Sequence, residues 1–535
     1  MAFVAMQVVE VVVPYAGMPD TVGTAVLIVL TVGFPVALTL SWVLDLTPPR
    51  VQLEDTESAA RASGTEERPL RPDSVAVLPF ENRSDDPEDA YFSDGITDDI
   101  ITSIAHIHGL RVLSRTSSMV YRGAALTIPQ VARELGVATV VTGSVRRHGS
   151  RVRVMAEVLD ARSDDHLWAD TYDRELQDIF EVQSEIATEI ARAVERELSV
   201  ADRRRIQIRG TQDSEAYDLY LRARFLWNQR TEAAVAEGIR FYRRALERDP
   251  GFALAHAGLA DAYAVLGIYG MRDPGEVLEA ARASAEAALE IEPHLGEALA
   301  VRACVAGIYD WKWAAAEDEY RRAVEFAPSY ATAYQWYAIN LLAPHRRFDE
   351  AHEQLALARE LDPASSAISV SQAIIHFYER DLERALHEFE LLVRVHPRFS
   401  LAHLFLGHTR ELTGDAEGAL DALSKAAMLG EESSETLSAL GCALAGAGRR
   451  PEAERILSRL VERSGRQYVS PALIAQVYIG LGRTDEALDR LEEAVRCRAT
   501  DLIWLKVRPV YDGLHDSPRF QVLEQALGFS EGVEA

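Results

Sequence analysis

Positive charge is scarce in this sequence, and the scarcity narrows the possible partners. The 535 residues include 83 acidic side chains against 56 lysines and arginines, a net charge of −27. No basic run is longer than Arg203-Arg204-Arg205. Because a strongly acidic surface repels phosphates, we expect no nucleic acid among the partners. Lysine is almost absent, which we interpret as genome composition; it occurs only as Lys312, Lys425 and Lys506.

Cysteine is also scarce, and the motifs of common enzymes are missing. Cys304, Cys442 and Cys497 lie far apart, so they predict neither a disulfide framework nor a CxxC metal site. The sequence has no GxxxxGK(S/T) phosphate loop, no HExxH or GxSxG motif and no kinase HRD or DFG set. His256 and His403 occupy positions where packing residues are expected. We therefore expect no catalytic residue, no bound metal and no cofactor, and interpret the chain as a protein that is not an enzyme.

A long uncharged stretch lies near the N-terminus. Val22–Leu44 carries no charge between Asp20 and Asp45, and at about 1.5 Å per residue it reaches roughly 34 Å, enough to cross a bilayer core. It predicts a transmembrane helix within a membrane element of residues 1–46, with a buried core helix as the alternative. Residues 47–73, rich in proline and charge, predict a disordered linker. Arginine is found only after the span, which favours a cytoplasmic C-terminal side but leaves the orientation open.

Residues 74–200 change to short runs that are typical of a mixed α/β domain. Val152, Val154, Ala156 and Val158 alternate with polar residues, which predicts a half-buried strand. We expect helices at Ala90–Ile107, Ile128–Leu135 and Ile179–Leu198, and strands at Ser74–Phe80, Leu110–Leu113, Ala138–Val145, Arg151–Leu159 and His166–Tyr172.

An acidic cluster lies in the first of these helices. Asp94, Asp98 and Asp99 raise the alternative of a metal site, but the oxygen-ligand spacing of a calcium loop is missing. We prefer the interpretation that a helix begins near Asp94-Gly95 and that the carboxylates stabilise its N-terminus through the helix dipole.

Four sequence blocks in this domain resemble the TolB amino-terminal-like domain of bacterial proteins. In family order they read SVAVLPFENRS, FSDGITDDIITSIAHIHGLRVLSRTSS, VARELGVATVVTGSVRRHGSRVRVMAEVLDA and HLWADTYDRELQDIFEVQSEIA. In that family the domain often joins a membrane span to helical repeats, or follows a nucleotide-cyclase, protein-kinase or winged-helix domain. The resemblance therefore implies a protein of the bacterial inner membrane, anchored by a single pass or a hairpin.

The C-terminal half repeats with a period of 34 or 35 residues. A helix–turn–helix repeat of 34 residues is the tetratricopeptide signature, and small residues such as Gly407, twelve positions before Ala419, would let the two helices of a pair approach closely. We predict eight pairs over residues 214–497, an insertion near Ile268–Gly275, and a capping helix and tail in residues 498–535. The period is clearest in the series Ala281, Ala316, Ala351, Ala385, Ala419, Ala453 and Ala487.

The expected fold is therefore multidomain: a transmembrane helix, a TolB-like α/β domain and an all-α superhelical solenoid of tetratricopeptide repeats. The first helix of each pair should line the concave face, where ten residues predict a protein-binding groove for a helix or an extended peptide. The alternative is that these residues pack against their own neighbours. The ten residues are Val301, Val305, Ile308, Gln335, Ile339, Leu342, Val370, Ile374, Phe377 and Leu404.

Two functions fit this organisation. The first is a scaffold or adaptor that is held at the lipid bilayer by residues 22–44 and binds other proteins or peptides through the solenoid. The alternative is the regulatory or sensory tail of a nucleotide cyclase or Ser/Thr kinase system whose catalytic domain is absent from this chain. The sequence upstream of Met1 would separate them, because a catalytic domain fused in frame would favour the regulatory tail.

Removing residues 1–47 should make the chain soluble without detergent, because only that segment is compatible with lipid. The full-length chain should need detergent. The measurement is sedimentation with washed membranes for the full chain and for residues 48–535. A truncated chain that still sediments with the membranes would place the anchor elsewhere.

Overall fold

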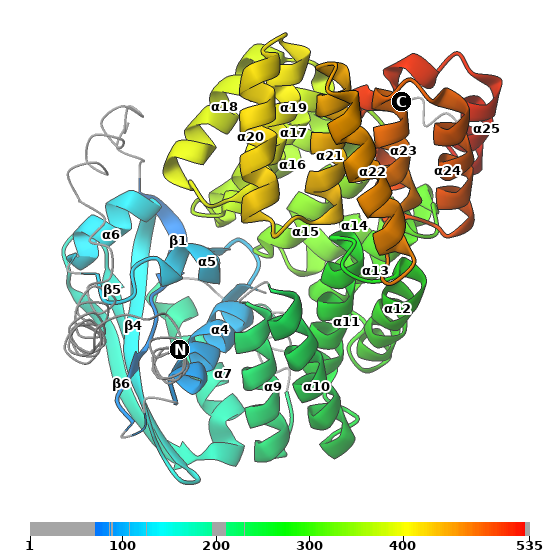
Figure 1. Cartoon of the computed structure of the whole chain (residues 1–535). Coiled ribbons are helices and arrows are strands. Elements are labelled where there is room, and N and C mark those ends of the chain that lie inside the picture. The colour runs from blue at the N-terminus through cyan, green and yellow to red at the C-terminus, as the bar shows by residue number, and fades with distance from the viewer. Residues whose placement is uncertain are drawn as a thin grey trace, which may run out of the picture. The chain divides into compact units, whose positions relative to one another are not determined.

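The computed structural model describes residues 70–529, except for 85, 87–88, 106, 125, 195–198, 200–209 and 229–230. The predicted membrane element of residues 1–46, its span at 22–44 and all but the last residues of the predicted linker lie outside this part of the chain. Within it, no helix is both long and apolar enough to cross a membrane. A small sheet domain and a long helical array make up the described residues (Figure 1), and their contacts join them into a single unit.

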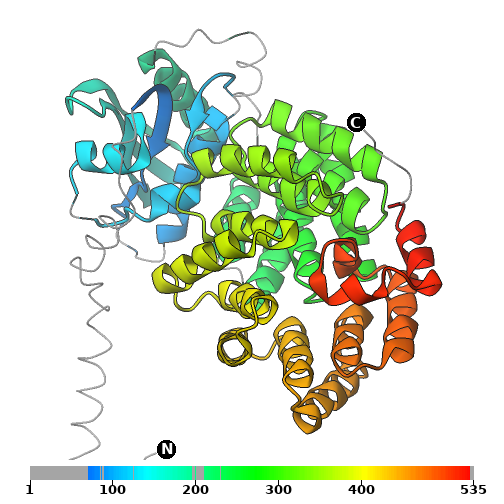
Figure 2. The ribbon, with the colours of Figure 1, turned by 90° about the horizontal axis from the view of Figure 1, so that it is seen from above.

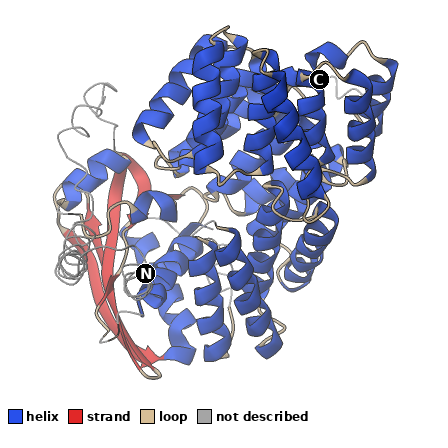
Figure 3. Cartoon of the chain, in the orientation of Figure 1, coloured by secondary structure: helices blue, strands red, loops and turns tan. Residues whose placement is uncertain are grey.

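The sheet domain is built on six strands, shown red in Figure 3. The strand order is β3-β1-β4-β5-β6, with β2 paired to β4; β1 is parallel to β3 and β4, whereas β4, β5 and β6 form an antiparallel meander. The strands are β1 (Arg71–Val77), β2 (Glu81–Asn82), β3 (Arg111–Val112), β4 (Val137–His148), β5 (Arg151–Asp160) and β6 (His166–Glu175). The helices are α4 (Ala90–Ala105), α5 (Arg115–Met119), α6 (Ile128–Leu135), the single turn η2 (Leu176–Asp178) and α7 (Ile179–Ala193).

The alternation in β5 buries Val152, Val154, Ala156 and Val158 in one cluster with α4 and α7, while α6 covers the opposite face of the sheet. The β4–β5 hairpin turns at Gly149, whose φ of +59° lies in the left-handed region that suits glycine. The short helix α5 and the two-residue strand β2 were not predicted. Strand β1 also begins inside the predicted linker, because Arg71 pairs in register with Val137 of β4.

The helical array contains eight successive helix pairs among the described residues, in the manner of a tetratricopeptide-repeat solenoid. The pairs are α9 (Ser214–Trp227) with α10 (Glu232–Arg248), α11 (Ala253–Ile268) with α12 (Pro274–Ile291), α13 (Gly296–Ile308) with α14 (Trp313–Phe326), α15 (Ala331–Tyr337) and its π-turn η3 (Ala338–Leu342) with α16 (Phe348–Leu361), α17 (Ser366–Glu379) with α18 (Leu382–Val395), α19 (Ser400–Leu412) with α20 (Ala416–Leu429), α21 (Ser434–Gly446) with α22 (Arg450–Ser464), and α23 (Pro471–Gly480) with α24 (Thr484–Arg496).

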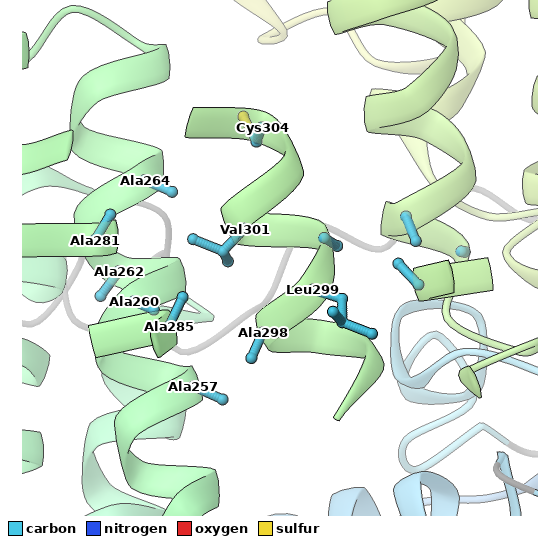
Figure 4. Packing of buried hydrophobic residues seen from close by; sticks show 14 of the residues in the cluster. Ala257, Ala260, Ala262, Ala264, Ala281, Ala285, Ala298, Leu299, Val301 and Cys304 are labelled. Carbon is cyan, nitrogen blue, oxygen red and sulfur yellow. The ribbon is translucent and has the colours of Figure 1, made fainter. Parts of the chain in front are cut away.

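Small side chains allow the two helices of each pair to approach closely. A Cβ atom on Gly407 of α19 would lie 2.5 Å from Leu423 and 3.2 Å from the carbonyl oxygen of Ala419, both on α20. Figure 4 shows buried small residues earlier in the array, among them Ala264 of α11 and Ala281 of α12, the two helices of the second pair. Bulkier residues at these positions would push the backbones apart.

After α24 the chain folds back along the array as the C-terminal segment, which we define as Ala499–Phe529. It contains two short helical turns, η4 (Thr500–Trp504) and η5 (Pro509–Leu514), and one helix, α25 (Pro518–Ala526). Figure 2 shows this segment, in red, between the green and orange helices of the array. The hydroxyl group of Thr500 donates to the carbonyl oxygen of Gly267 at 3.2 Å, which joins the segment to the second helix pair.

Ala419→Arg should destabilise the array much more than Glu417→Arg, although the sites are two residues apart. Ala419 is 1% exposed at the helix contact, so an arginine there would overpack it and bury a charge, at a cost on the order of several kcal/mol. Glu417 is exposed, where substitutions usually change stability by less than about 0.5 kcal/mol. Circular dichroism melting of the two variants makes the measurement. Equal melting temperatures would show that this helix contact does not limit stability.

Candidate protein-binding surface

The sheet domain packs against the array through α4 and α5. Gly95 of α4 has no room for a side chain, because a Cβ atom would lie 2.5 Å from Leu221 of α9. At the other end of the contact, the hydroxyl group of Ser117 in α5 donates to Asp362 at the end of α16 at 2.7 Å. The Ser114 amide donates to the Leu361 carbonyl at 2.8 Å. The sheet domain therefore connects the first helix pair with the junction of the fourth and fifth pairs.

Charged side chains are buried where α4 meets α9. Asp98 forms ion pairs with Arg115 at 2.6 Å and with Arg224 at 3.5 Å. Asp99 accepts hydrogen bonds from the hydroxyl group of Tyr217 at 2.5 Å and the side-chain amide of Gln183 at 3.1 Å. Burial raises the pKa of Asp99 to about 6, with the Arg224 charge acting in the opposite direction, and burial also raises the pKa of Asp98.

This network corrects the helix-dipole interpretation of the acidic cluster. Helix α4 begins at Ala90, so Asp94, Asp98 and Asp99 lie within the helix and not at its N-terminus. Their carboxylates contact guanidinium, phenol and amide groups, with Asp94 held by Arg115 and Arg122. The cluster therefore stabilises the contact between the sheet domain and the array.

A cavity of about 210 Å³ lies beside this network, between α4, α5 and the first helices of several pairs. Glu297 of α13 contributes a buried carboxylate oxygen, Oε2, that has no hydrogen-bond partner among the described residues. The lining combines four carboxylates with aromatic rings, which suits the cavity to a cationic group. Arg115 and Arg224 neutralise part of the negative charge of the carboxylates. The acidic and aromatic residues of the lining are Asp98, Asp261, Glu297, Asp362, Tyr220, Tyr242, Tyr330 and Trp227.

The ten predicted groove residues are brought together by the structure, but largely in the interior of the protein. Gln335 and Ile339 are half-buried and the other eight are buried. Val507 of the C-terminal segment shares a buried cluster with Val370, Ile374, Phe377 and Leu404. Leu502, Ile503 and Leu505 share another with Val301, Val305, Ile308 and Leu342. These contacts agree with the alternative interpretation, in which the ten residues pack against other parts of the chain. That the ten residues bind a partner stays a prediction.

Polar contacts hold the C-terminal segment against these residues. A guanidinium nitrogen of Arg380 donates to the carbonyl oxygen of Val507 at 2.8 Å, and another contacts Asp512. The rings of Tyr378 and Trp504 stack with their centroids 4.9 Å apart. The concave face is therefore covered by the chain itself in this region, a feature that the period of the repeats does not reveal.

The two histidines predicted to be packing residues each make the same kind of contact. The Nε2 atom of His256 lies 3.0 Å from the carbonyl oxygen of Pro250, and that of His403 lies 3.0 Å from the carbonyl oxygen of Pro397. In both cases the carbonyl belongs to the residue six positions earlier, in the turn before the helix. The side chains therefore support the turns that join successive pairs.

Comparisons with known proteins match parts of the chain. Residues 71–189 match the family model described as the second domain of HilA/YgeH-like transcriptional regulators. A stretch of 192 residues is 47% identical to the putative adenylate cyclase 3 of Rhizobium meliloti (strain 1021). The match covers 36% of this chain and 32% of that protein, so the chain spans about a third of its relative's length.

Solved structures of helical-repeat proteins show a remote likeness. PilW, a widely conserved type IV pilus biogenesis factor, is 20% identical, with 39% of this chain and 95% of PilW covered and a TM-score of 0.31. A tetratricopeptide repeat protein from Parabacteroides merdae ATCC 43184 is 13% identical, with 59% and 99% covered and a TM-score of 0.32. With scores this low, the assignment of the array rests on its own helix pairs and period.

Arg224→Met should destabilise the protein by about 3 kcal/mol at neutral pH, because it leaves buried Asp98 and Asp99 with less positive charge. The raised pKa of Asp99 means that protonation favours the folded state below about pH 6, and this contribution is lost as the pH rises. The variant should raise that pKa further. The loss in free energy of unfolding relative to the wild type should therefore be smaller at pH 5 than at pH 7.5.

Urea unfolding of both proteins at the two pH values makes the measurement. Arg240→Met is the matched control, because Arg240 lies on the neighbouring helix α10 with its side chain 70% exposed. A deficit that is the same at both pH values, or that the control reproduces, would show that the buried carboxylates do not depend on Arg224.

Proposed function

We propose that this protein is a scaffold without catalytic activity, and that it binds protein partners at the junction of its sheet domain and its helical array. The observation that carries the proposal is the buried, unpartnered oxygen of Glu297 in an acidic and aromatic cavity. A buried polar atom without a partner is costly, so it favours a ligand that supplies a donor.

The chemistry of the cavity favours a lysine or arginine side chain of the partner. Carboxylates attract the cation, and tyrosine and tryptophan faces such as those of Tyr220 and Trp227 stabilise it. The net charge of −27 acts in the same direction at longer range, since it steers basic segments toward the chain.

We also propose where in the cell the scaffold is held and which domain family its sheet domain resembles. We infer that residues 22–44 anchor the scaffold in the bacterial inner membrane, and that residues 74–200 are a TolB amino-terminal-like domain. The uncharged length of the span and the four sequence blocks described above support these two inferences. A membrane anchor would make membrane-associated proteins candidate partners.

A regulatory role in a nucleotide-cyclase system is the second candidate. The observation in its favour is the 47% identity to a protein named as a putative adenylate cyclase over 192 residues. Its test is the cyclase activity of membranes from the source organism with and without an excess of this chain. An unchanged activity would leave the scaffold as the better explanation.

Glu297→Lys should weaken binding of basic peptides, because it replaces the unpartnered carboxylate by a positive charge that repels them. The measurement is binding of the full chain to arrayed peptides with a central lysine or arginine, next to the same peptides with norleucine or citrulline at that position. We expect the basic peptides to be preferred and the variant to bind them at least tenfold less well, about 1.4 kcal/mol.

Glu286→Lys is the matched control, because it changes the net charge equally at an exposed site on α12. Equal losses in the two variants would show that the attraction is non-specific and would contradict the cavity as the binding site.

A further inference from the structure

Three side chains from two adjacent helix pairs converge away from the cavity. His352 lies on α16, and His376 and Glu379 lie one turn apart on α17. The Nε2 atom of His352 is 3.0 Å from Oε2 of Glu379, and Nδ1 of His376 is 3.7 Å from the same oxygen. One potential ligand atom from each residue lies within 4.8 Å of the other two.

His376 is unusual among these residues because it is buried without hydrogen bonds. It is 2% exposed, yet neither ring nitrogen has a hydrogen-bond partner within the described part of the chain. Buried imidazole groups normally have such partners, and leaving both nitrogens unpaired is costly.

Polar groups stand behind both imidazole rings. The amide nitrogen Nε2 of Gln372 lies 2.7 Å from Nδ1 of His352. Exchanging the positions of the amide nitrogen and oxygen would let the oxygen accept from Nδ1–H, and Nε2 of His352, which faces Glu379, would then carry the lone pair. A carboxylate oxygen of Glu388 on α18 lies 3.6 Å from Nε2 of His376, on the far side of that ring from Glu379. A carboxylate or carbonyl behind a histidine is the usual support of a metal ligand.

We propose that His352, His376 and Glu379 bind a divalent transition-metal ion of the zinc type. Two imidazole nitrogens and one carboxylate suit zinc, whereas calcium and magnesium prefer oxygen ligands alone. Metal–ligand distances of about 2.1 Å in a tetrahedron place the ligands roughly 3.4 Å apart. The two separations from Glu379, 3.0 and 3.7 Å, lie on either side of this value. The imidazole rings of His352 and His376 lie 4.6 Å apart, centroid to centroid, at an interplanar angle of 31°, so they would turn toward the ion on binding.

The ion would connect α16 of the fourth helix pair to α17 of the fifth. The sheet domain contacts the same two helices at their other end, through Asp362 at the end of α16, so the ion would add a second link across the junction of these pairs. Three protein ligands leave a fourth position, which water fills in the isolated protein. The proposal does not depend on the acidic cavity, since the two sites share no residue.

Zinc titration of the chelator-stripped full chain, followed by competition with a metal-binding dye, tests the proposal. We expect one zinc per chain and a melting temperature that rises with zinc. His352→Ala and Glu379→Gln should each weaken binding at least tenfold and remove the rise in melting temperature. Both side chains are partly exposed, so these variants should fold even if a variant of buried His376 does not.

His396→Ala is the control, because His396 is an exposed histidine at the end of α18. Substitution by cobalt adds a direct readout, since inner-sphere imidazole ligands produce visible absorption bands that either ligand variant should remove. No stoichiometric zinc binding by the wild type, or equal weakening by His396→Ala and His352→Ala, would overturn the proposal.

Discussion

The structure depends on one constraint: a pair of amphipathic helices cannot bury its apolar surface alone. Each pair relies on the next, and this dependence continues to both ends of the array. At the first pair the sheet domain provides the cover, with Leu221 of α9 packed over Gly95 of α4. Along the concave face the C-terminal segment provides it through Leu502 and Val507. The two covers are therefore part of the fold.

Patterns that repeat at short range could be read from the sequence. The 34-residue series that includes Ala419 indicates helix contacts, and the alternation of apolar and polar residues from Val152 to Val158 indicates a half-buried strand. Both patterns are informative because each residue's environment depends on near neighbours. The insertion near Ile268–Gly275 was also visible as a longer interval. Its structural form was not: the extra residues lengthen α11 and α12 as well as the turn between them.

Contacts between distant residues could not be predicted, because periodicity shows that a surface is apolar and does not show what covers it. Ser117 and Asp362 are 245 residues apart, and nothing local to either one indicates the other. The same holds for the groove residues under the C-terminal segment and for the cavity around Glu297. The histidine group escaped a motif search for a related reason: His352 and His376 lie on different helices, so their spacing matches no linear metal signature.

The return path of the C-terminal segment has a consequence for synthesis. Residues 499–529 emerge from the ribosome after all eight helix pairs, at ordinary elongation rates roughly 10 to 45 s after α11 and α13. Throughout that interval Val301, Val305 and Phe377 lack the side chains that cover them in the finished protein. The nascent chain therefore exposes these apolar residues until the C-terminal segment has been made. A chain that ended before residue 499 would contain every helix pair and still lack the residues that share these buried clusters.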